Sequence, residues 1–340
     1  MKFGVFVNVQ QPRADDPVRR FGEAVDAARL ARAVGFDALA AGHHYLSPPY
    51  QSLQSLPLLA RLAAEAPGMD LCLSVLLLAM LNPVQTAEEV ASLDIMSGGH
   101  VVLGVGIGYR DIEYEAFGMT ARERVPRLLE ALRLIKRLWS EEVVSFEGRF
   151  FRVHGATCTI RPVQRPHPPI WIAANADAAV LRTARLGYSW LINPHAALPT
   201  LERQWQRYRQ ALAAAGQVMP ATRPMILELS VAPTREEAVA TARPHLEAKY
   251  AAYAEWGQDK VLPGEENFRV DFADLARDRF ILGTPDEAIE QIEERVRRLD
   301  SNYFIFRLGW PGMAATEVMR VIELVGQRVL PHFHRKYGRD

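Results

Sequence analysis

The chain has 340 residues, of which 40 are Lys or Arg and 40 are Asp or Glu, so its formal net charge is +0. Such a balance gives no strong overall field, and we expect neither nucleic acid nor a membrane as a partner. Hydrophobic residues make up 49% of the chain, which excludes wholesale disorder. The length suits a (β/α) barrel with insertions or two ordinary domains.

The cysteine content and the apolar segments indicate the cellular compartment. The two cysteines, Cys72 and Cys158, cannot form a disulfide framework for a chain of this length and suit a reducing environment. The first residues enter a strand pattern without a secretion signal. The longest apolar run, 71–81, is interrupted by Ser74 and is too short to span a bilayer. We therefore expect a cytoplasmic protein.

Strand and helix patterns alternate along the chain. Strands are predicted near 3–9, 37–41, 70–77, 100–106, 169–174, 188–192, 225–232 and 302–308. Helices are predicted near 17–34, 55–66, 84–97, 123–139, 177–186, 198–214, 235–255, 285–299 and 314–328. Helix followed by buried strand, repeated, is typical of a parallel sheet. The predicted fold class is α/β, a TIM (β/α)8 barrel in one domain over 1–340, because no linker divides the chain into the two halves of a doubly wound sheet.

An internal repeat in the sequence supports this alternation of helix and strand. Segments 28–40 and 180–192 each read as an amphipathic helix, a glycine, an aromatic residue and a short apolar strand. Glycine suits the end of a helix, where φ is often positive. A third version over 295–306 keeps the order without the glycine. Helix starts are expected at 86–89 and 284–287, where a threonine precedes acidic residues.

Two stretches interrupt the alternation and are predicted as insertions. Residues 140–168 contain a hairpin turning at Glu147-Gly148, followed by a Pro-rich surface connection. Residues 257–280 are polar and follow a long helix, and we expect them to form a lid, since long insertions on a barrel often serve binding.

Histidines follow the second predicted strand, at the end where barrel enzymes place their sites. His43 and His44 are adjacent, so we expect at most one to face the site and handle a proton. A surface or capping role is the alternative interpretation. No third ligand lies at a characteristic spacing, so no metal site is predicted.

Glycines alternate after the fourth predicted strand, at Gly104, Gly106 and Gly108. A dinucleotide fingerprint would need a glycine in place of Tyr109, so Rossmann-type binding is not favoured. The interpretation we prefer is that these glycines let a flat ligand approach the backbone.

The fifth predicted strand leads through small residues into a helix. Ala174, Asn175, Ala176 and Ala179 leave backbone N–H groups open at a helix N-terminus, which suits a phosphate. An ordinary Asn or Asp helix cap is the alternative, and Asp177 argues against a phosphate unless its side chain points away.

Two charges occur inside strand patterns, Glu228 and Arg307. Period-2 alternation places both on the same face as neighbouring apolar residues. An unpaired buried charge would be costly, so we expect a Glu228–Arg307 ion pair beneath the site.

Several segments carry a further signal jointly, in order along the chain. They are 87–94 with 97–99, 103–110, 113–118, 124–130, 146–151, 165–171 and 282–285. Together they resemble the bacterial luciferase-like (LLM class) flavin-dependent oxidoreductases and monooxygenases. The resemblance implies a TIM barrel, usually in a homodimer, with a reduced flavin or deazaflavin at the carboxyl ends of the strands.

The resemblance also implies site residues. His43 matches the histidine of the family's Glu-His-His segment, although Gly42 replaces the acidic residue here. Ser74 and Val75 match the place of a frequent non-prolyl cis peptide beneath the flavin, and Gly106 lies at the flavin level. The phosphate-holding turn matches Ala174, Asn175, Ala176 and Ala179 without the family's common Ser or Thr side chains. Arg124 lies at the family's arginine position, which implies a role in holding the phosphate, with a structural ion pair as the alternative.

The expected function follows from this resemblance. It is a two-component monooxygenase in which a separate flavin reductase supplies reduced FMN, which reacts with O2 to oxygenate a small apolar substrate. Met80, Trp190, Trp310 and Met313 follow strands and are candidates for the pocket wall, with the hydrophobic core as the alternative. Two alternatives stay open: hydride transfer with the deazaflavin coenzyme F420, and a non-catalytic flavin-binding accessory protein.

Overall fold

The computed structural model describes residues 1–8, 10–264 and 266–338. Its centre is a curled parallel sheet of nine strands, in the order β10-β9-β6-β5-β3-β1-β13-β11-β12. The strands are β1 (Lys2–Phe6), β3 (Ala38–Ala41), β5 (Asp70–Leu76), β6 (Val101–Val105), β9 (Ile170–Ala173), β10 (Ser189–Leu191), β11 (Pro224–Val231), β12 (Ile281–Gly283) and β13 (Tyr303–Arg307).

One parallel bridge links β10, at one end of this strand order, to β11, which is next to the other end. Ile192, directly after β10, bridges to Met225 in β11. The Ile192 N–H donates to the carbonyl of Pro224 at 3.0 Å, and the Ile226 N–H donates to the carbonyl of Ile192 at 2.8 Å. Strand β12 pairs with the last residues of β11.

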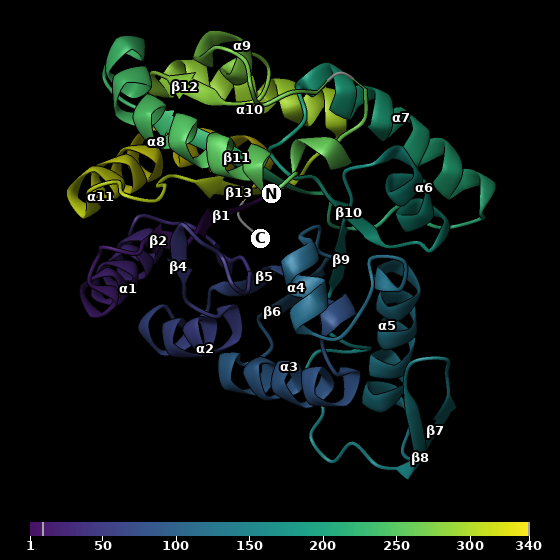
Figure 1. The fold of residues 1–340 in the computed structure, drawn as a ribbon. Coiled ribbons are helices and arrows are strands. Elements are labelled where there is room, and N and C mark those ends of the chain that lie inside the picture. The colour runs from purple at the N-terminus through teal and green to yellow at the C-terminus, as the bar shows by residue number, and fades with distance from the viewer. Residues whose placement is uncertain (9, 265, 339–340) are drawn as a thin grey trace.

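Helices surround the sheet (Figure 1). They are α1 (Pro17–Ala33), α2 (Ser55–Glu65), α3 (Pro83–Ser97), α4 (Asp111–Ala116), α5 (Arg124–Ser140), α6 (Asp177–Arg185), α7 (Leu198–Ala214), α8 (Arg235–Glu255), α9 (Phe272–Ala276), α10 (Pro285–Leu299), α11 (Ala315–Leu324) and α12 (Leu330–Tyr337). Short helical turns cover Leu78–Met80, Asp259–Val261 and Val325–Val329. Within the described ranges, no helix is long and apolar enough to cross a membrane.

The strands bury both faces because their side chains alternate between two cores. In β3, Ala38 and Ala40 join an inner cluster with Trp171, Ile226 and Ile305. Leu39 and Ala41 belong instead to the larger cluster shared with the helices. Two apolar faces per strand are what a sheet covered by helices requires.

The predicted helix–glycine–strand repeats share a left-handed backbone conformation where the helix ends. Gly35 and Gly187 have φ of 97° and 73°, each just after a helix. In the third version, Asp300 ends α10 with φ of 51°, so an aspartate occupies the left-handed position where glycine is absent.

Several predicted boundaries were wrong. Helix α3 begins at Pro83 and not at Thr86: the Asn82 side chain caps it, and the Thr86 hydroxyl donates back to the Asn82 carbonyl. Asp111 begins the short helix α4, which the sequence pattern did not predict. The first strand ends at Phe6, and the predicted end at residue 9 lies outside the described residues. At 284–287, by contrast, the predicted start of α10 is confirmed as a full capping box.

Both insertions have the predicted positions. Strands β7 (Val144–Glu147) and β8 (Arg152–Ala156) form the hairpin, and the Glu130 carboxylate accepts from the backbone N–H groups of residues 149–151 in its turn. The second insertion is less polar than expected. Phe268, Phe272 and Phe280 are buried in a separate apolar cluster that includes Tyr250 of α8. A further small hairpin pairs β2 (Gln10–Pro12) with β4 (Tyr50–Ser52).

Candidate functional site

A cavity of about 410 Å³ lies at the carboxyl ends of the strands. Segments after β1, β3, β6, β9 and β10 line it, together with Arg307 at the end of β13 and residues 258–262 of the second insertion. Every predicted site residue lines this cavity: His43, Ser74, Val75, Gly106, Arg124, Ala174, Asn175, Ala176 and Ala179. The fold therefore brings together residues from five separate parts of the sequence, although their roles stay predictions.

His43 is buried and held at both ring nitrogens. Its Nε2 lies 2.7 Å from Oε1 of Gln54, and the Leu77 N–H donates to its Nδ1 at 3.3 Å. The amide of Gln54 is itself oriented, because its Nε2 donates to the carbonyl of His44. Nε2 of His43 must therefore carry the proton.

The surroundings keep His43 neutral. Burial lowers the pKa of His43 to about 4, against a smaller opposing effect of the Gln54 hydrogen bond. Gln54 thus takes the place that Gly42 leaves vacant as the partner orienting the ring. The sequence pattern did not reveal this, because Gln54 precedes α2 and comes close only through the fold.

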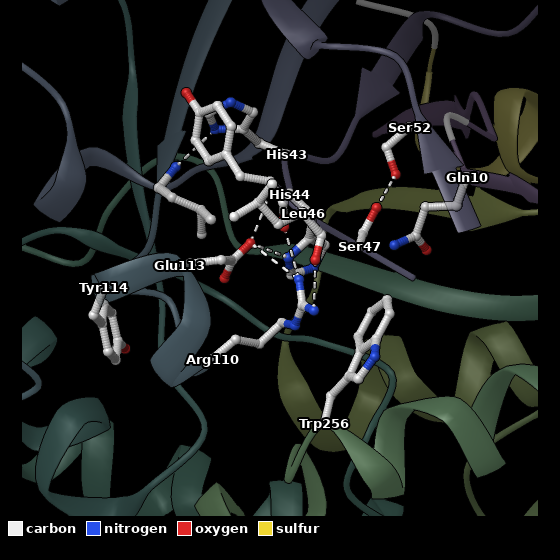
Figure 2. A network of polar contacts seen from close by, with 12 residues as sticks. Gln10, His43, His44, Leu46, Ser47, Ser52, Arg110, Glu113, Tyr114 and Trp256 are labelled. Carbon is white, nitrogen blue, oxygen red and sulfur yellow. Dashed lines mark hydrogen bonds and ion pairs between the residues drawn. The ribbon is translucent and has the colours of Figure 1, made fainter. Parts of the chain in front are cut away.

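The neighbouring His44 belongs to a separate polar network (Figure 2). Its Nδ1 lies 3.1 Å from Oε1 of Glu113, which also accepts the Tyr45 N–H. Arg110 donates to the carbonyls of Tyr45 and Leu46, and its guanidinium lies 4.4 Å from the ring centre of Trp256. Trp256 directly precedes the second insertion, so the network fixes one end of that insertion beside the histidine loop.

The floor of the cavity contains the predicted cis peptide. The bond between Ser74 and Val75 is cis and non-prolyl, which confirms that expectation. The interpretation of the glycines beside this bond needs correction. A Cβ on Gly104 would lie 2.2 Å from the carbonyl oxygen of Leu73, and one on Gly106 would lie 2.8 Å from Val75. These glycines are required by the close approach of β5, and the interpretation that they admit a ligand was incomplete.

One end of the cavity is cationic and rich in open N–H groups. Helix α6 starts there, and its N-cap residue, Ala176, makes no side-chain capping bond. Arg124 and Arg182 both line this end, and among the described residues neither forms an ion pair with a carboxylate. Burial and then the charge of Arg124 lower the pKa of Arg182. Arg124 donates to the Tyr114 hydroxyl at 3.4 Å, which leaves its charge in place. An uncapped helix N-terminus with two guanidinium groups that no carboxylate neutralises can hold a dianion.

Asp177 does not oppose that charge. Its carboxylate points to α7, where Arg203, Gln204 and Arg207 bind it. The hydrogen bond from Arg203 is the largest cause of its lowered pKa. Arg182 was not predicted as a site residue, since its position reads as an ordinary exposed helix residue until α5 and α6 are placed together.

The predicted Glu228–Arg307 ion pair was wrong. The two residues are register partners on β11 and β13. Glu228, fully buried, instead pairs with Lys249 of α8 and accepts a hydrogen bond from Nε1 of Trp310 at 2.6 Å. Arg307 lies 3.4 Å from the ring centre of Phe6. A helix residue that the strand pattern could not reveal supplies the partner.

The predicted apolar wall also needs correction. Met80, Trp190, Trp310 and Met313 do not line the cavity and are buried in core clusters. The apolar lining comes instead from Phe6, Leu77, Ile107, Val261 and Leu262.

Comparison with known proteins gives a consistent result. Residues 1–302 match the model of a family described as luciferase-like monooxygenase. A curated relative, the F420-dependent glucose-6-phosphate dehydrogenase of Microbacterium testaceum, is 28% identical over 327 residues, 93% of this chain and 94% of that protein. An uncharacterised protein of Sinorhizobium fredii is 30% identical over 175 residues, so the match spans about half of each chain, 52% and 51%.

Solved structures share the architecture. Monooxygenase RslO1 from Streptomyces bottropensis superposes with a TM-score of 0.87 at 26% identity, over 98% of this chain and 100% of that one. The oxygenating constituent of 3,6-diketocamphane monooxygenase from Pseudomonas putida, solved in complex with FMN, has a TM-score of 0.80 at 17% identity, over 97% and 98% of the two chains. The second similarity shows the fold alone.

Proposed function

Because this chain belongs to the luciferase-like monooxygenase family and is therefore an oxidoreductase, we propose that it binds reduced FMN and uses O2 to oxygenate a small substrate with an apolar body. The cofactor would be supplied by a separate flavin reductase. The third glycine of a dinucleotide fingerprint is replaced by Tyr109, which supports an external source of reducing equivalents.

The cationic end of the cavity carries this proposal. Arg124, Arg182 and the open N-terminus of α6 together match the two negative charges of a terminal phosphate. Backbone N–H groups at 176–178 would hold phosphate oxygens in place of the hydroxyl side chains that the turn lacks, since the Ala179 N–H already donates to the carbonyl of Ala176. Val75, Leu77 and Ile107 give the lining an apolar part that would accept a flat ring over the Ser74–Val75 bond.

The bound flavin would supply the electrons and the site of oxygen activation. The chain itself would position the cofactor and the substrate, keep water out of the cavity and control a proton. Val261 and Leu262 of the second insertion line the cavity and would limit the access of water. His43, neutral and with its proton fixed on Nε2, is the proposed proton-handling residue, with Gln54 setting the orientation of its ring.

A second function within the family is hydride transfer with coenzyme F420. The observation in its favour is the full-length similarity to a protein named as F420-dependent. F420 carries a phosphodiester with an extended acidic tail, whereas FMN ends in a phosphate monoester. The paired arginines beside the open N-terminus of α6 offer the charge that a phosphate monoester needs and so favour FMN.

The experiment separates these functions by cofactor. Purified protein is mixed either with reduced FMN, generated by an added flavin reductase, or with reduced F420. A panel of small ketones, phenols and carboxylic acids is then added, and oxygen uptake and cofactor oxidation are measured. Substrate-stimulated product formation that requires O2 and FMN supports the monooxygenase. Turnover with reduced F420 under nitrogen contradicts it. Cofactor binding without turnover, unaffected by His43→Ala beyond affinity, would support an accessory flavin-binding role.

We also propose that the Ile192–Met225 bridge closes eight of the strands into a (β/α)8 barrel, with β12 outside the ring. In a closed ring, the amides of Ile192 and Ile226 exchange as slowly as those of β1. Fast exchange at both amides, with β1 protected, would indicate an open sheet. The homodimer, the single domain and the cytoplasmic location remain predictions of the sequence.

A further inference from the structure

Unpaired polar groups collect in the lining of the cavity around Arg307, at the end of β13. Nε2 of Gln10, Oε1 of Gln258, the Tyr109 hydroxyl and Nε of Arg307 are buried without a hydrogen-bond partner. Gln10 and Gln258 are only 5% and 2% exposed, and all four residues line the cavity. Buried polar atoms are normally satisfied, so these atoms indicate a bound group.

Arg307 supplies the charge of this wall. Its guanidinium lies over the ring of Phe6 at the end of β13, and among the described residues it forms no ion pair with a carboxylate. The carboxylate closest to it in strand register, Glu228, is taken by Lys249, Trp310 and Tyr250. Arg307 is therefore an uncompensated cation facing the cavity.

His195 adds a neutral donor. The Gln258 side chain presents its Nε2 to Nδ1 of His195 at 3.1 Å, so Nδ1 accepts and Nε2 carries the proton. Burial, followed by the positive charges of Lys249 and Arg307, lowers the pKa of His195 well below its usual value. The imidazole therefore remains uncharged and can donate from Nε2.

Gln10 and two phenols supply further donors, whereas the unpaired Oε1 of Gln258 is an acceptor and does not contact the anion. The Tyr253 hydroxyl donates to Oε1 of Gln10 at 3.1 Å, which leaves the Gln10 amide N–H groups for a ligand. Burial raises the pKa of Tyr253 to about 12 and that of Tyr109 well above its usual value, so both phenols keep their protons. Lys260, on the second insertion, adds another cation to the lining.

We propose that this wall binds an oxyanion of the substrate, a carboxylate or a phenolate, with Arg307 as the specificity-determining residue and Gln10, Tyr109 and His195 as hydrogen-bond donors. The proposal rests on the proposed function only in using the same cavity. It refines the expected substrate: an apolar body that faces Phe6, Ile107 and Leu262 and carries one anionic oxygen group.

The test uses 4-nitrophenol, whose ionised form is yellow, with protein free of cofactor, so that neither flavin chemistry nor O2 is involved. A titration of the bound probe is followed by absorbance. Since an opposite charge within a few ångströms lowers the pKa of an acid, we expect the bound phenol to ionise about one pH unit lower than in buffer. Benzoate should compete with the probe, and benzamide, a neutral molecule of the same shape, should not.

Variants show which residue causes the shift in the pKa of the bound probe. Arg307→Met should abolish the shift and weaken benzoate binding about tenfold or more, whereas Arg307→Lys should retain most of the shift. Arg124→Gln, at the other cationic end, is the matched control and should leave the titration unchanged. Gln10→Leu gives a second measure if Arg307→Met does not fold, and it should weaken benzoate more than benzamide.

The possible outcomes are distinct. Tighter binding of benzoate than of nitrophenolate identifies the carboxylate, and the reverse order identifies the phenolate. Equal binding of benzoate and benzamide, or loss of the shift in Arg124→Gln with retention in Arg307→Met, overturns the proposal. So does displacement of the probe by FMN together with weaker FMN binding in Arg307→Met, because Arg307 would then contact the cofactor. Absence of FMN-dependent turnover would leave the probe titration unaffected.

Discussion

A buried neutral histidine makes stability depend on acidity, and His43 gives the clearest case. Its folded-state pKa is about 4, below the unfolded value of 6.5, because burial disfavours the charged ring. The unfolded chain therefore binds more protons between these values, and stability falls as the pH drops from 6.5 toward 4. The loss amounts to about 3 kcal/mol in full and about 2 kcal/mol at pH 5.

The prediction is tested by urea unfolding at pH 7 and pH 5. His43→Gln should remove about 2 kcal/mol of the pH dependence, since it removes the titrating group. His154, whose side chain is 73% exposed, provides the control, and His154→Gln should keep the wild-type dependence. Equal pH dependence in His43→Gln and wild type would show that His43 is not buried in the neutral form.

The Lys249–Glu228 pair gives a second prediction at this scale. Both side chains are fully or almost fully buried, at 1% and 0% exposure, and burial lowers the pKa of Lys249 to about 7 despite its partner. Lys249→Met leaves a buried carboxylate without its cation and should destabilise the protein by about 3–5 kcal/mol. The double variant Lys249→Met/Glu228→Gln should lose less than the sum of the single losses in denaturant unfolding, and additive losses would contradict coupling.

The sequence predicted some residues of this site, and the others could not be predicted for a physical reason. His43, Arg124 and the 174–179 turn follow or precede recognisable elements, and the resemblance to a family placed them. Gln54 and Arg182 act through contacts between elements, which single-chain periodicity does not contain. The Glu228–Arg307 error has the same origin: strand alternation gives the face of a charge, while its partner came from a helix.

At the scale of elements, helix α3 allows a matched pair of substitutions. The Asn82 side chain accepts the N–H groups of Val84 and Gln85, so Asn82→Ala should cost about 1 kcal/mol of unfolding free energy. The hydroxyl of Thr86, one turn later, donates only to the Asn82 carbonyl, and Thr86 is buried. Thr86→Val, which keeps the buried methyl group, should therefore cost clearly less. Denaturant midpoints of the two variants measure the difference. The reverse order would restore Thr86 as the start of the helix.

Long periodic elements were predictable, and short or contact-dependent ones were not. Helices α7 and α8 have the predicted bounds because a long amphipathic pattern between turn signals determines both ends. The short helix α4 and strand β12 have too few residues for periodicity to register. The apolar cluster under the second insertion was missed because its phenylalanines are spaced irregularly and meet only through α8.

For the whole molecule, alternation of strands and helices sufficed to predict a parallel sheet with its site at the carboxyl ends of the strands. The order of strands followed the chain, apart from the addition of β12. The shape of the cavity was not predictable, because it depends on which loop side chains meet. The polar wall around Arg307 appears only once β1, β10, β13 and the second insertion are in place.

The central claim is that the cavity holds a flavin by its terminal phosphate, between Arg124 and Arg182. The most direct measurement is the affinity of reduced FMN and of reduced riboflavin, which lacks only the phosphate, by anaerobic titration of wild type and Arg182→Gln. We predict tighter binding of FMN by wild type, and a loss of about tenfold or more for FMN with no change for riboflavin in the variant. Equal affinities of wild type for the two flavins, or equal losses in the variant, would contradict the account.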